Sequence, residues 1–127
     1  MTAAPWLLVA VGGALGSVAR YGVNVAAGRL LGAGFPFGTL AVNVVGGLGI
    51  GLLAGMFALR GDASQTLRLF LITGVLGGFT TFSAFSLDAV ALWERGATGL
   101  AALYVAVSVV LSIGAVVAGL ALARALG

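Results

Sequence analysis

Residues 74–85, with the sequence GVLGGFTTFSAF, decide how this chain folds. They place two adjacent glycines, three hydroxyl side chains and three phenylalanines inside an apolar segment. Glycine weakens a helix, and in hydrocarbon an unpaired backbone amide or carbonyl costs several kcal/mol. Such a stretch is tolerated at membrane depth only where it is buried in protein or lines a polar path. We therefore expect a break in a membrane helix and a pathway beside it.

The rest of the composition indicates a membrane protein. Of the 127 residues, 61% are hydrophobic and 7% are charged. A transmembrane helix needs about 20 apolar residues, and the charges divide the chain into four such segments. We expect helices over residues 3–31, 36–59, 66–94 and 98–125. The predicted fold is an all-α membrane protein, one domain over residues 1–127 with four transmembrane helices, the third broken in mid-membrane.

Missing residue types narrow the chemistry. The chain has no Cys, His or Lys, which excludes disulfides, thiolate metal sites and most nucleophilic catalysis. The three acids lie in loops or near span ends with no base beside them, so we do not expect an enzyme. The net charge of +3 comes from scattered arginines rather than from a basic run. We therefore expect no nucleic-acid partner.

Arginines are spread almost evenly over the two ends of the expected bundle. The two sets are Arg60, Arg68 and Arg124 on the side of the termini and, on the other side, Arg29, Arg95 and Arg20, which leans toward it. The positive-inside rule requires an imbalance that this chain does not supply. In membrane lipid, a chain that inserts both ways would pair with an inverted copy, which predicts a dual-topology antiparallel homodimer. The competing explanation is that small membrane proteins often carry few charges.

Small and polar residues recur every four positions along the first two expected helices. The two stripes are Gly12, Gly16, Arg20, Asn24 and Gly28, and Thr39, Asn43, Gly47, Gly51 and Gly55. Residues at this spacing share one helix face, and small ones let backbones approach closely. Helix packing is the default interpretation of the glycines.

The polar stripe residues have two interpretations each. An Arg at bilayer depth costs about 2.5–3.5 kcal/mol, so Arg20 reaches an aqueous vestibule, snorkels, or clamps helix carbonyls. Asn43 either joins helices or donates its amide to an anion. In the fourth helix Tyr104, Ser108 and Ser112 share a face, and the serines either line a pore or bond their own backbone.

The polar groups expected inside the membrane are hydrogen-bond donors rather than carboxylates. They are Arg20, Thr39, Asn43, Thr80, Thr81, Ser83, Tyr104, Ser108 and Ser112. A cation or proton transporter would need an intramembrane acid, so a donor-lined path favours an anion. Phe82 and Phe85 either pack in a core or turn their positive ring edges toward that anion.

Three motifs carry a family resemblance. They are residues 12–21 (GGALGSVARY), residues 38–43 (GTLAVN) with the glycines at 46–47, and residues 74–85. In order and spacing they closely resemble the Fluc (CrcB) family of fluoride channels, and the third motif is highly specific. The resemblance implies an antiparallel homodimer with two fluoride pores. It further implies passive export of fluoride from the cytoplasm across the plasma (inner) membrane of a microbe.

The resemblance also implies roles for individual residues. The pore residues would be Thr39, Asn43, Phe82, Ser83, Phe85, Tyr104, Ser108 and Ser112, with Arg20 in the vestibule. The backbone carbonyls of Gly77 and Thr80 from both subunits would bind one central structural Na⁺. Ala84 departs from the family motif, which usually has Thr there, and this removes a hydroxyl beside the pore rings.

Two other functions fit parts of the chain. A small multidrug exporter shares the four helices and the dual topology, but it needs a membrane-embedded carboxylate in the first helix, where this chain has Arg20. A structural subunit of a larger membrane complex would explain the glycines but not the polar break. The sequence leaves open whether Asp88 slows ion access or caps the third helix.

Overall fold

The structure is entirely helical over the residues it describes. It is a computed structural model that describes residues 3–60 and 65–127. The elements are α1 (Ala4–Leu31), α2 (Phe37–Arg60), α3 (Gln65–Arg68), the π-helix η1 (Leu69–Leu76), α4 (Gly77–Phe79), α5 (Phe82–Glu94) and α6 (Thr98–Leu126). In the described part of the chain, α1, α2, the run from α3 to α5, and α6 are long and apolar enough to cross a membrane. The prediction of four membrane-spanning helices is confirmed.

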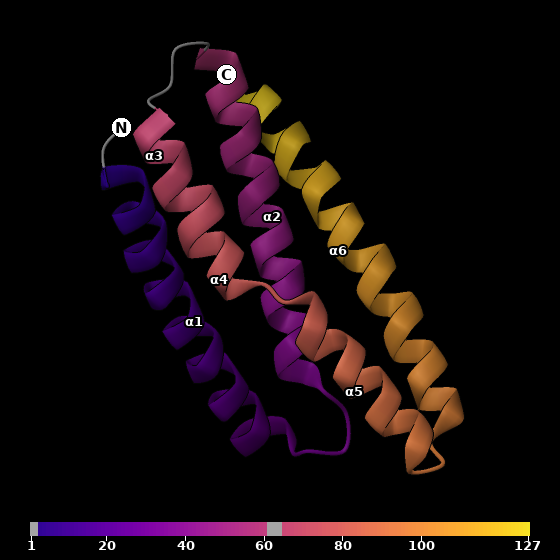
Figure 1. Ribbon diagram of the computed structural model, residues 1–127. Helices are drawn as coiled ribbons and strands as arrows, with labels where there is room; N and C mark the ends of the chain where they lie inside the picture. The colour runs from indigo at the N-terminus through magenta and orange to yellow at the C-terminus, as the bar shows by residue number, and fades with distance from the viewer. Residues whose placement is uncertain (1–2, 61–64) are drawn as a thin grey trace.

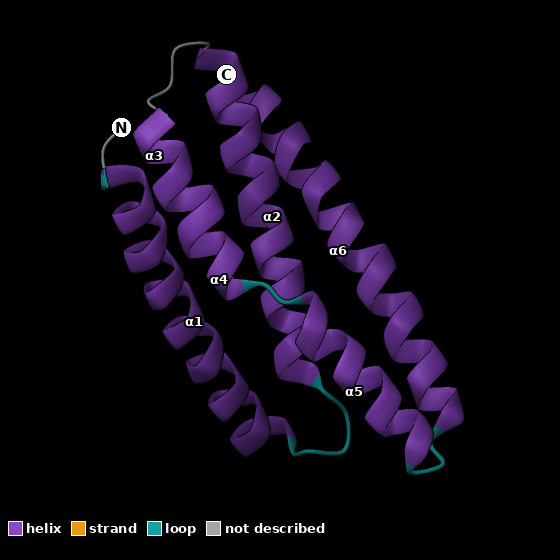
Figure 2. Ribbon diagram, viewed as in Figure 1, coloured by secondary structure: helices purple, strands orange, loops and turns teal. Residues whose placement is uncertain are grey.

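The helices run side by side, and the start of α1 and the end of α6 lie at the same end of the bundle (Figure 1). Two short connections at the opposite end, α1 to α2 and α5 to α6, are the loops visible there in Figure 2. Glycine ends α1 at Gly32, where φ is +80°, and the turn after α5 contains Gly96, where φ is +86°. Both residues adopt a conformation that other residues rarely accept.

The third span changes helix type along its length. It starts as the short α-helix α3, widens into η1, returns to α-helix in α4, and is then interrupted. The interruption lies at Thr80 (φ −87°, ψ 161°) and Thr81 (φ −156°, ψ 125°), both extended. The glycine pair of the motif is itself helical, within α4. Threonine accepts extended angles readily, and Thr81 then caps α5 by accepting the Ala84 N–H at 3.0 Å.

The bundle is held by two glycine-mediated contacts. A Cβ added at Gly16 of α1 would lie 2.0 Å from the Val75 carbonyl oxygen of η1, so α1 and η1 touch backbone to backbone. A Cβ added at Gly51 of α2 would lie 2.3 Å from the Val116 carbonyl oxygen of α6. Close approach of this kind is how membrane helices associate. The small-residue stripes therefore form the two main helix–helix contacts.

A small core of buried side chains that includes two aromatic rings joins α5 and α6. Its buried members are Phe85, Leu92, Ala101 and Tyr104, and Phe35 of the α1–α2 loop packs against them. Tyr104 is 0% exposed, although it carries a hydroxyl. This core therefore joins the interrupted span to the fourth helix through side chains.

Candidate functional site

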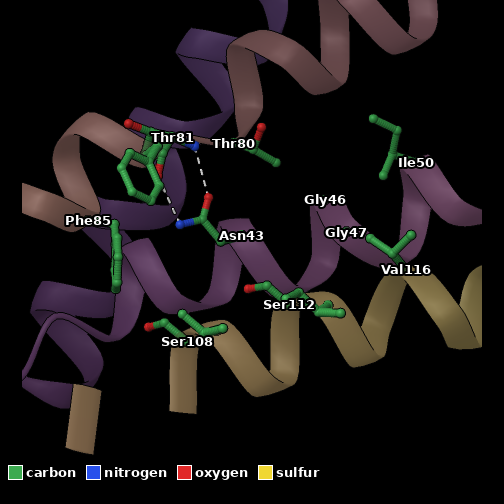
Figure 3. A pocket seen from close by; sticks show the side chains of 13 residues that line it. Asn43, Gly46, Gly47, Ile50, Thr80, Thr81, Phe85, Ser108, Ser112 and Val116 are labelled. Atoms are coloured by element: carbon green, nitrogen blue, oxygen red, sulfur yellow. Dashed lines mark hydrogen bonds between the residues drawn. The ribbon is translucent and has the colours of Figure 1, made fainter. Parts of the chain in front are cut away.

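A groove of about 530 Å³ lies beside the interruption of the third span. Its lining comes from α2, α5, α6 and the extended pair, and Figure 3 shows these side chains. The lining residues are Asn43, Gly46, Gly47, Ile50, Thr80, Thr81, Phe82, Phe85, Ser108, Val109, Ser112, Ile113 and Val116. Most of this wall is apolar, and the polar atoms come from Asn43, the two threonines and the two serines.

Asn43 holds the extended pair in place. Its Nδ2 donates to the Thr81 carbonyl oxygen at 3.0 Å, and its Oδ1 accepts the Thr81 N–H at 2.8 Å (Figure 3). In a continuous helix the Thr81 N–H would instead donate to the Gly77 carbonyl. Of the two interpretations offered for Asn43, the joining of helices is observed. One Nδ2 hydrogen is not needed for this pairing, because an amide nitrogen has two.

Arg20 forms a hydrogen bond with the backbone on the N-terminal side of the interruption. Its Nε donates to the Gly78 carbonyl oxygen at 3.1 Å. That carbonyl would accept the Phe82 N–H in a continuous helix. Arg20 therefore clamps a carbonyl, as one of its three interpretations predicted. The stripes of α1 and α2 thus extend from glycine contacts into polar contacts with the interruption.

Thr80 and Gly77, whose carbonyls were predicted to bind Na⁺, have different surroundings at the interruption. The Thr80 hydroxyl donates to the Leu76 carbonyl at 2.9 Å and its methyl group lies against Gly46, where an added Cβ would be 2.2 Å away. Gly77 lies in α4 outside the groove lining. The Ala84 N–H caps onto Thr81 Oγ1, so it does not reach the Thr80 carbonyl, its partner in a continuous helix.

Aromatic rings follow one another from the groove into the core. The Phe82 and Phe85 ring centroids are 5.6 Å apart, and those of Phe85 and Tyr104 are 5.2 Å apart. Phe35 then meets Tyr104 at 5.4 Å with the rings at 87°, an edge-to-face contact. Phe82 is 78% exposed and Phe85 is 8% exposed. Phe85 therefore packs in the core while Phe82 borders the open side of the groove.

The Asp88 carboxylate accepts hydrogen bonds from two of the hydroxyls that were predicted to line the ion path. Thr39 Oγ1 donates to Asp88 Oδ2 at 2.7 Å, and the Tyr104 hydroxyl donates to the same oxygen at 3.2 Å. Each hydroxyl has a single hydrogen, so both are directed toward the carboxylate. Thr39, Asp88 and Tyr104 lie beyond Phe85, outside the groove lining.

Two serine hydroxyls on α6 have no such partner. Ser108 Oγ and Ser112 Oγ are buried, and neither has a hydrogen-bond partner among the described residues. Both residues line the groove, one helical turn apart (Figure 3). A buried hydroxyl without a partner costs about 1–3 kcal/mol. The unused donors of the site are therefore Ser108, Ser112 and the second Nδ2 hydrogen of Asn43.

The structure thus divides the predicted site residues. Asn43, Thr80, Phe82, Phe85, Ser108 and Ser112 meet in the groove. Thr39 and Tyr104 form the Asp88 cluster next to it, whereas Arg20 and Gly77 border the interruption from outside. Ser83 is exposed outside the lining, with its hydroxyl 3.3 Å from Thr81 Oγ1.

From the sequence, Asp88 had two open roles, slowing ion access or capping the third helix, and Thr81 was not distinguished from its neighbours. The spacing of three residues from Phe85 to Asp88 was a usable signal, because it places both on the α5 face that meets Tyr104. The described residues contain no group of three or more His, Cys, Asp or Glu side chains that could hold a metal ion. The chemistry available is hydrogen-bond donation, ring edges and backbone carbonyls.

The chain is similar to known proteins over most of its length. Residues 7–120 match the family described as "CrcB-like protein, Camphor Resistance (CrcB)". The chain is 59% identical over 121 residues to "Fluoride-specific ion channel FluC" of Rhodopseudomonas palustris (strain BisB5), covering 95% of this chain and 98% of the relative. It is 65% identical over 117 residues to the protein of that name in Agrobacterium fabrum (strain C58 / ATCC 33970), covering 92% and 94%.

A third relative of that name, from Rhizobium johnstonii (strain DSM 114642 / LMG 32736 / 3841), is 62% identical over 120 residues and covers 94% of this chain and 96% of its own length. The similarity thus extends over nearly the whole of each protein, including every helix of the bundle. The relatives are named as channels rather than as enzymes. With its four apolar helices, this chain is a multi-pass membrane protein of the Fluc (CrcB) family of fluoride-specific ion channels.

Proposed function

We propose that this chain exports fluoride passively from the cytoplasm, through the groove beside the interruption of the third span. The single observation that carries the proposal is a pair of buried serine hydroxyls that have no hydrogen-bond partner among the described residues, on Ser108 and Ser112, which line that groove. Hydroxyls aligned along an otherwise apolar wall can replace water around a small anion. The rest of the pathway is inferred from what lies next to them.

The groove supplies two kinds of anion contact. The serine hydroxyls and the second Nδ2 hydrogen of Asn43 are donors, while Phe82 and Phe85 present rings whose edges carry partial positive charge. These contacts bind an anion without a fixed charge, so the ion is not held too tightly to leave. Ser83 would extend the polar track, and Arg20 would attract anions at the vestibule.

The Asp88 cluster continues the route from Phe85. Tyr104 lies one turn from Ser108 on α6, and its hydroxyl is oriented by Asp88 together with that of Thr39. A carboxylate that keeps both donors occupied would also repel a passing anion. We propose that fluoride takes over one of these hydroxyls as it passes, so that Asp88 weakens binding at this end.

The working unit of the proposal is an antiparallel homodimer with two pores. The groove is open on one side, where the Phe82 ring is 78% exposed, and the polar groups that line it would be costly to leave beside hydrocarbon. The arginines are divided almost evenly between the two ends of the helix bundle, which supports insertion in both orientations. An inverted second copy would cover the groove and create a second, symmetry-related one.

A central Na⁺ fits the backbone at the interruption. The Thr81 N–H bonds Asn43 and the Ala84 N–H bonds Thr81 Oγ1, so the Gly77 and Thr80 carbonyls lose their usual helical donors. Carbonyl oxygens suit a small hard cation, and two from each subunit would provide four. The Gly77 and Thr80 carbonyls would hold the ion, which supplies positive charge that joins the two interruptions.

Passive conduction is sufficient for export. Hydrofluoric acid is a weak acid that crosses lipid in neutral form and dissociates inside the cell. A membrane potential negative inside then drives the anion outward through a selective pore. No nucleotide-binding motif occurs in the sequence, which agrees with a route that needs no ATP.

The experiment that tests the function is fluoride efflux from liposomes that contain the purified protein. A fluoride electrode would follow wild type, Phe82→Ile, and the control Phe37→Ile, an aromatic outside the groove. We expect rapid fluoride loss with retained chloride, slowed at least about tenfold by Phe82→Ile and unchanged by the control. A folded wild-type protein that releases neither anion would overturn the proposal.

Dimer topology and sodium have separate tests. Because the chain has no Cys, Ala33→Cys provides a unique label on the α1–α2 loop. An impermeant maleimide applied to intact cells should label about half of the chains, and labelling of all or none would contradict dual topology. Replacing Na⁺ by N-methylglucamine throughout purification should lower the melting temperature of the dimer, whereas an unchanged value would exclude a structural Na⁺.

A further inference from the structure

The α1–α2 loop, residues 32–36, reaches from outside the membrane spans to the buried Tyr104. Phe35 is the loop residue in contact, at 5.4 Å and 87° between the rings. Edge-to-face pairs of this kind stabilise a fixed ring orientation. Tyr104 is therefore held between two rings, with Phe85 on the groove side and Phe35 on the loop side.

The loop is itself fixed at several points. Arg95, just after α5, donates from its guanidinium to the Gly34 carbonyl oxygen. The Phe37 N–H donates to the Phe35 carbonyl at 2.8 Å, which closes a tight turn at Pro36, and the Leu40 N–H donates to the Pro36 carbonyl at 3.2 Å. Gly32, at φ +80°, gives the chain its change of direction after α1. The Phe35 side chain therefore projects from a constrained loop.

The same loop covers a hollow that ends on the Asp88 cluster. The hollow has a volume of about 130 Å³ and is lined by Ala33, Gly34, Pro36, Asp88, Ala91, Leu92 and Arg95. Arg95 and Asp88 both line this hollow: Arg95 donates to the loop at the Gly34 carbonyl, and Asp88 accepts the Tyr104 hydroxyl. The loop, the carboxylate and the tyrosine form one connected unit.

We propose that Phe35 and Arg95 are positioning residues for Tyr104, and that they control fluoride flux through it. The inference rests on the proposed function. Phe35 fixes the Tyr104 ring, so that its hydroxyl stays on Asp88 and beside the route from Ser108. Arg95 keeps Phe35 in place through the Gly34 carbonyl. Neither residue touches the conducted ion.

Without the Phe35 ring, Tyr104 would have an empty space on its loop side. Rotation of the ring into that space would move its hydroxyl away from the Asp88 oxygen, now 3.2 Å away. The Phe85 ring, 5.2 Å from Tyr104, would lose its support on that side. A change outside the membrane spans would then alter the groove itself.

The test measures fluoride efflux from liposomes for Phe35→Ala, Phe35→Leu and Phe35→Tyr, with Phe37→Ala as the matched control. Phe37 contacts Phe35 at 4.9 Å, but no ring contact joins it to Tyr104 among the described residues. We expect Phe35→Ala to slow efflux about fivefold, Phe35→Leu to restore it partly, and Phe35→Tyr and Phe37→Ala to resemble wild type. Gel filtration would establish that each variant is a folded dimer.

A double-mutant cycle with Tyr104→Phe distinguishes positioning from general loosening. If Phe35 acts through the Tyr104 hydroxyl, Phe35→Ala should slow efflux much less in the Tyr104→Phe background than in wild type. Equal effects in both backgrounds would overturn the proposal, as would wild-type efflux by Phe35→Ala. If Phe35→Ala failed to fold, Phe35→Leu in the same cycle would decide.

Arg95 has its own pair of variants. Arg95→Lys keeps the charge but replaces the planar guanidinium, one nitrogen of which donates to the Gly34 carbonyl, with a compact ammonium on a flexible stem, so we expect it to slow efflux about twofold to threefold. Wild-type efflux in Arg95→Lys, with slow efflux in Arg95→Gln, would mean that only the charge matters and would overturn the positioning role of Arg95. Absence of fluoride efflux from the wild type would instead refute the proposed function, so the two failures are distinguishable.

Discussion

The two halves of the third span differ in how they contact the rest of the bundle. Before the interruption, η1 and α4 lie against α1 through backbone atoms, with Gly12 facing Gly74 and Gly13 facing Gly78. After it, α5 meets α6 through side chains, with Phe85 against Tyr104 and Asp88 accepting the Tyr104 hydroxyl. Figure 1 shows the first half beside α1 and the second half beside α6.

The first half therefore supports the fold, whereas the second half carries the side chains that can bind an ion. A backbone-to-backbone contact leaves no room for side chains and allows little adjustment, because interiors are close-packed. A contact made of rings and hydroxyls can present polar atoms to an ion and exchange partners. The interruption lies between the two halves, where Arg20 donates to the Gly78 carbonyl and Asn43 pairs with the Thr81 backbone.

The largest effect should come from filling the backbone contact of the first half. A side chain at Gly16 would collide with the Val75 carbonyl, 2.0 Å from the added Cβ, and with the Phe79 nitrogen at 2.8 Å. Gly16→Val should destabilise the fold by about 3 kcal/mol or more, because backbone cannot move aside as a side chain can. Yield and gel filtration in detergent would measure this.

Gly22→Val is the control for that prediction. It lies on the same helix, and an added Cβ at Gly22 has nothing within 4 Å. We expect a normal folded protein from it. If Gly16→Val purified and unfolded like Gly22→Val, the close approach of α1 and η1 would be wrong.

An intermediate effect should come from the interruption. Asn43→Ala removes both bonds to Thr81, at 3.0 Å and 2.8 Å, and leaves backbone groups without partners. We expect a loss of stability of about 2 kcal/mol and a large drop in fluoride efflux. Asn24→Ala, in the α1 stripe and exposed, should change neither. Normal stability with slow efflux would mean that Asn43 serves the ion rather than the backbone.

The smallest effect should come from the side-chain contact of the second half. Thr39→Val removes one donor to Asp88 but keeps the shape of the side chain, and Tyr104 still donates to the same oxygen. We expect efflux to change by about threefold, with stability within about 1 kcal/mol of wild type. Ser86→Ala is the control, because that hydroxyl donates to the Phe82 carbonyl of its own helix. Equal effects would remove Thr39 from the pathway.

The stripes show how far sequence reasoning extends. Spacing by four predicted that Gly12, Gly16, Gly47, Gly51 and Gly55 share helix faces, and each meets a neighbouring helix at close range. Periodicity does this well because it reports the geometry of one helix. Gly28, at the end of the α1 stripe, has nothing within 4 Å of an added Cβ, since the helix there extends past its neighbour.

The Asp88 cluster shows where sequence reasoning stops. Thr39, Asp88 and Tyr104 belong to three different elements, separated by 49 and 16 residues. Sequence reasoning grouped Thr39 and Tyr104 with the donors and left Asp88 apart as a span-end acid. Folding alone brings the partners together. It therefore decides which hydroxyl donates to a carboxylate and which remains available to a ligand.

By itself the sequence determined the membrane fold, the family and the set of polar groups, because apolar span length, four-residue spacing and a specific motif are local properties. Only the tertiary structure decided that the extended residues are Thr80 and Thr81, that Asn43 and Arg20 hold them, and that Ser108 and Ser112 keep their hydroxyls without a partner among the described residues. The physical reason is that hydrogen-bond capacity is limited for each atom. Which hydrogen bonds an atom makes therefore depends on which partners the packed helices bring within about 3 Å of it.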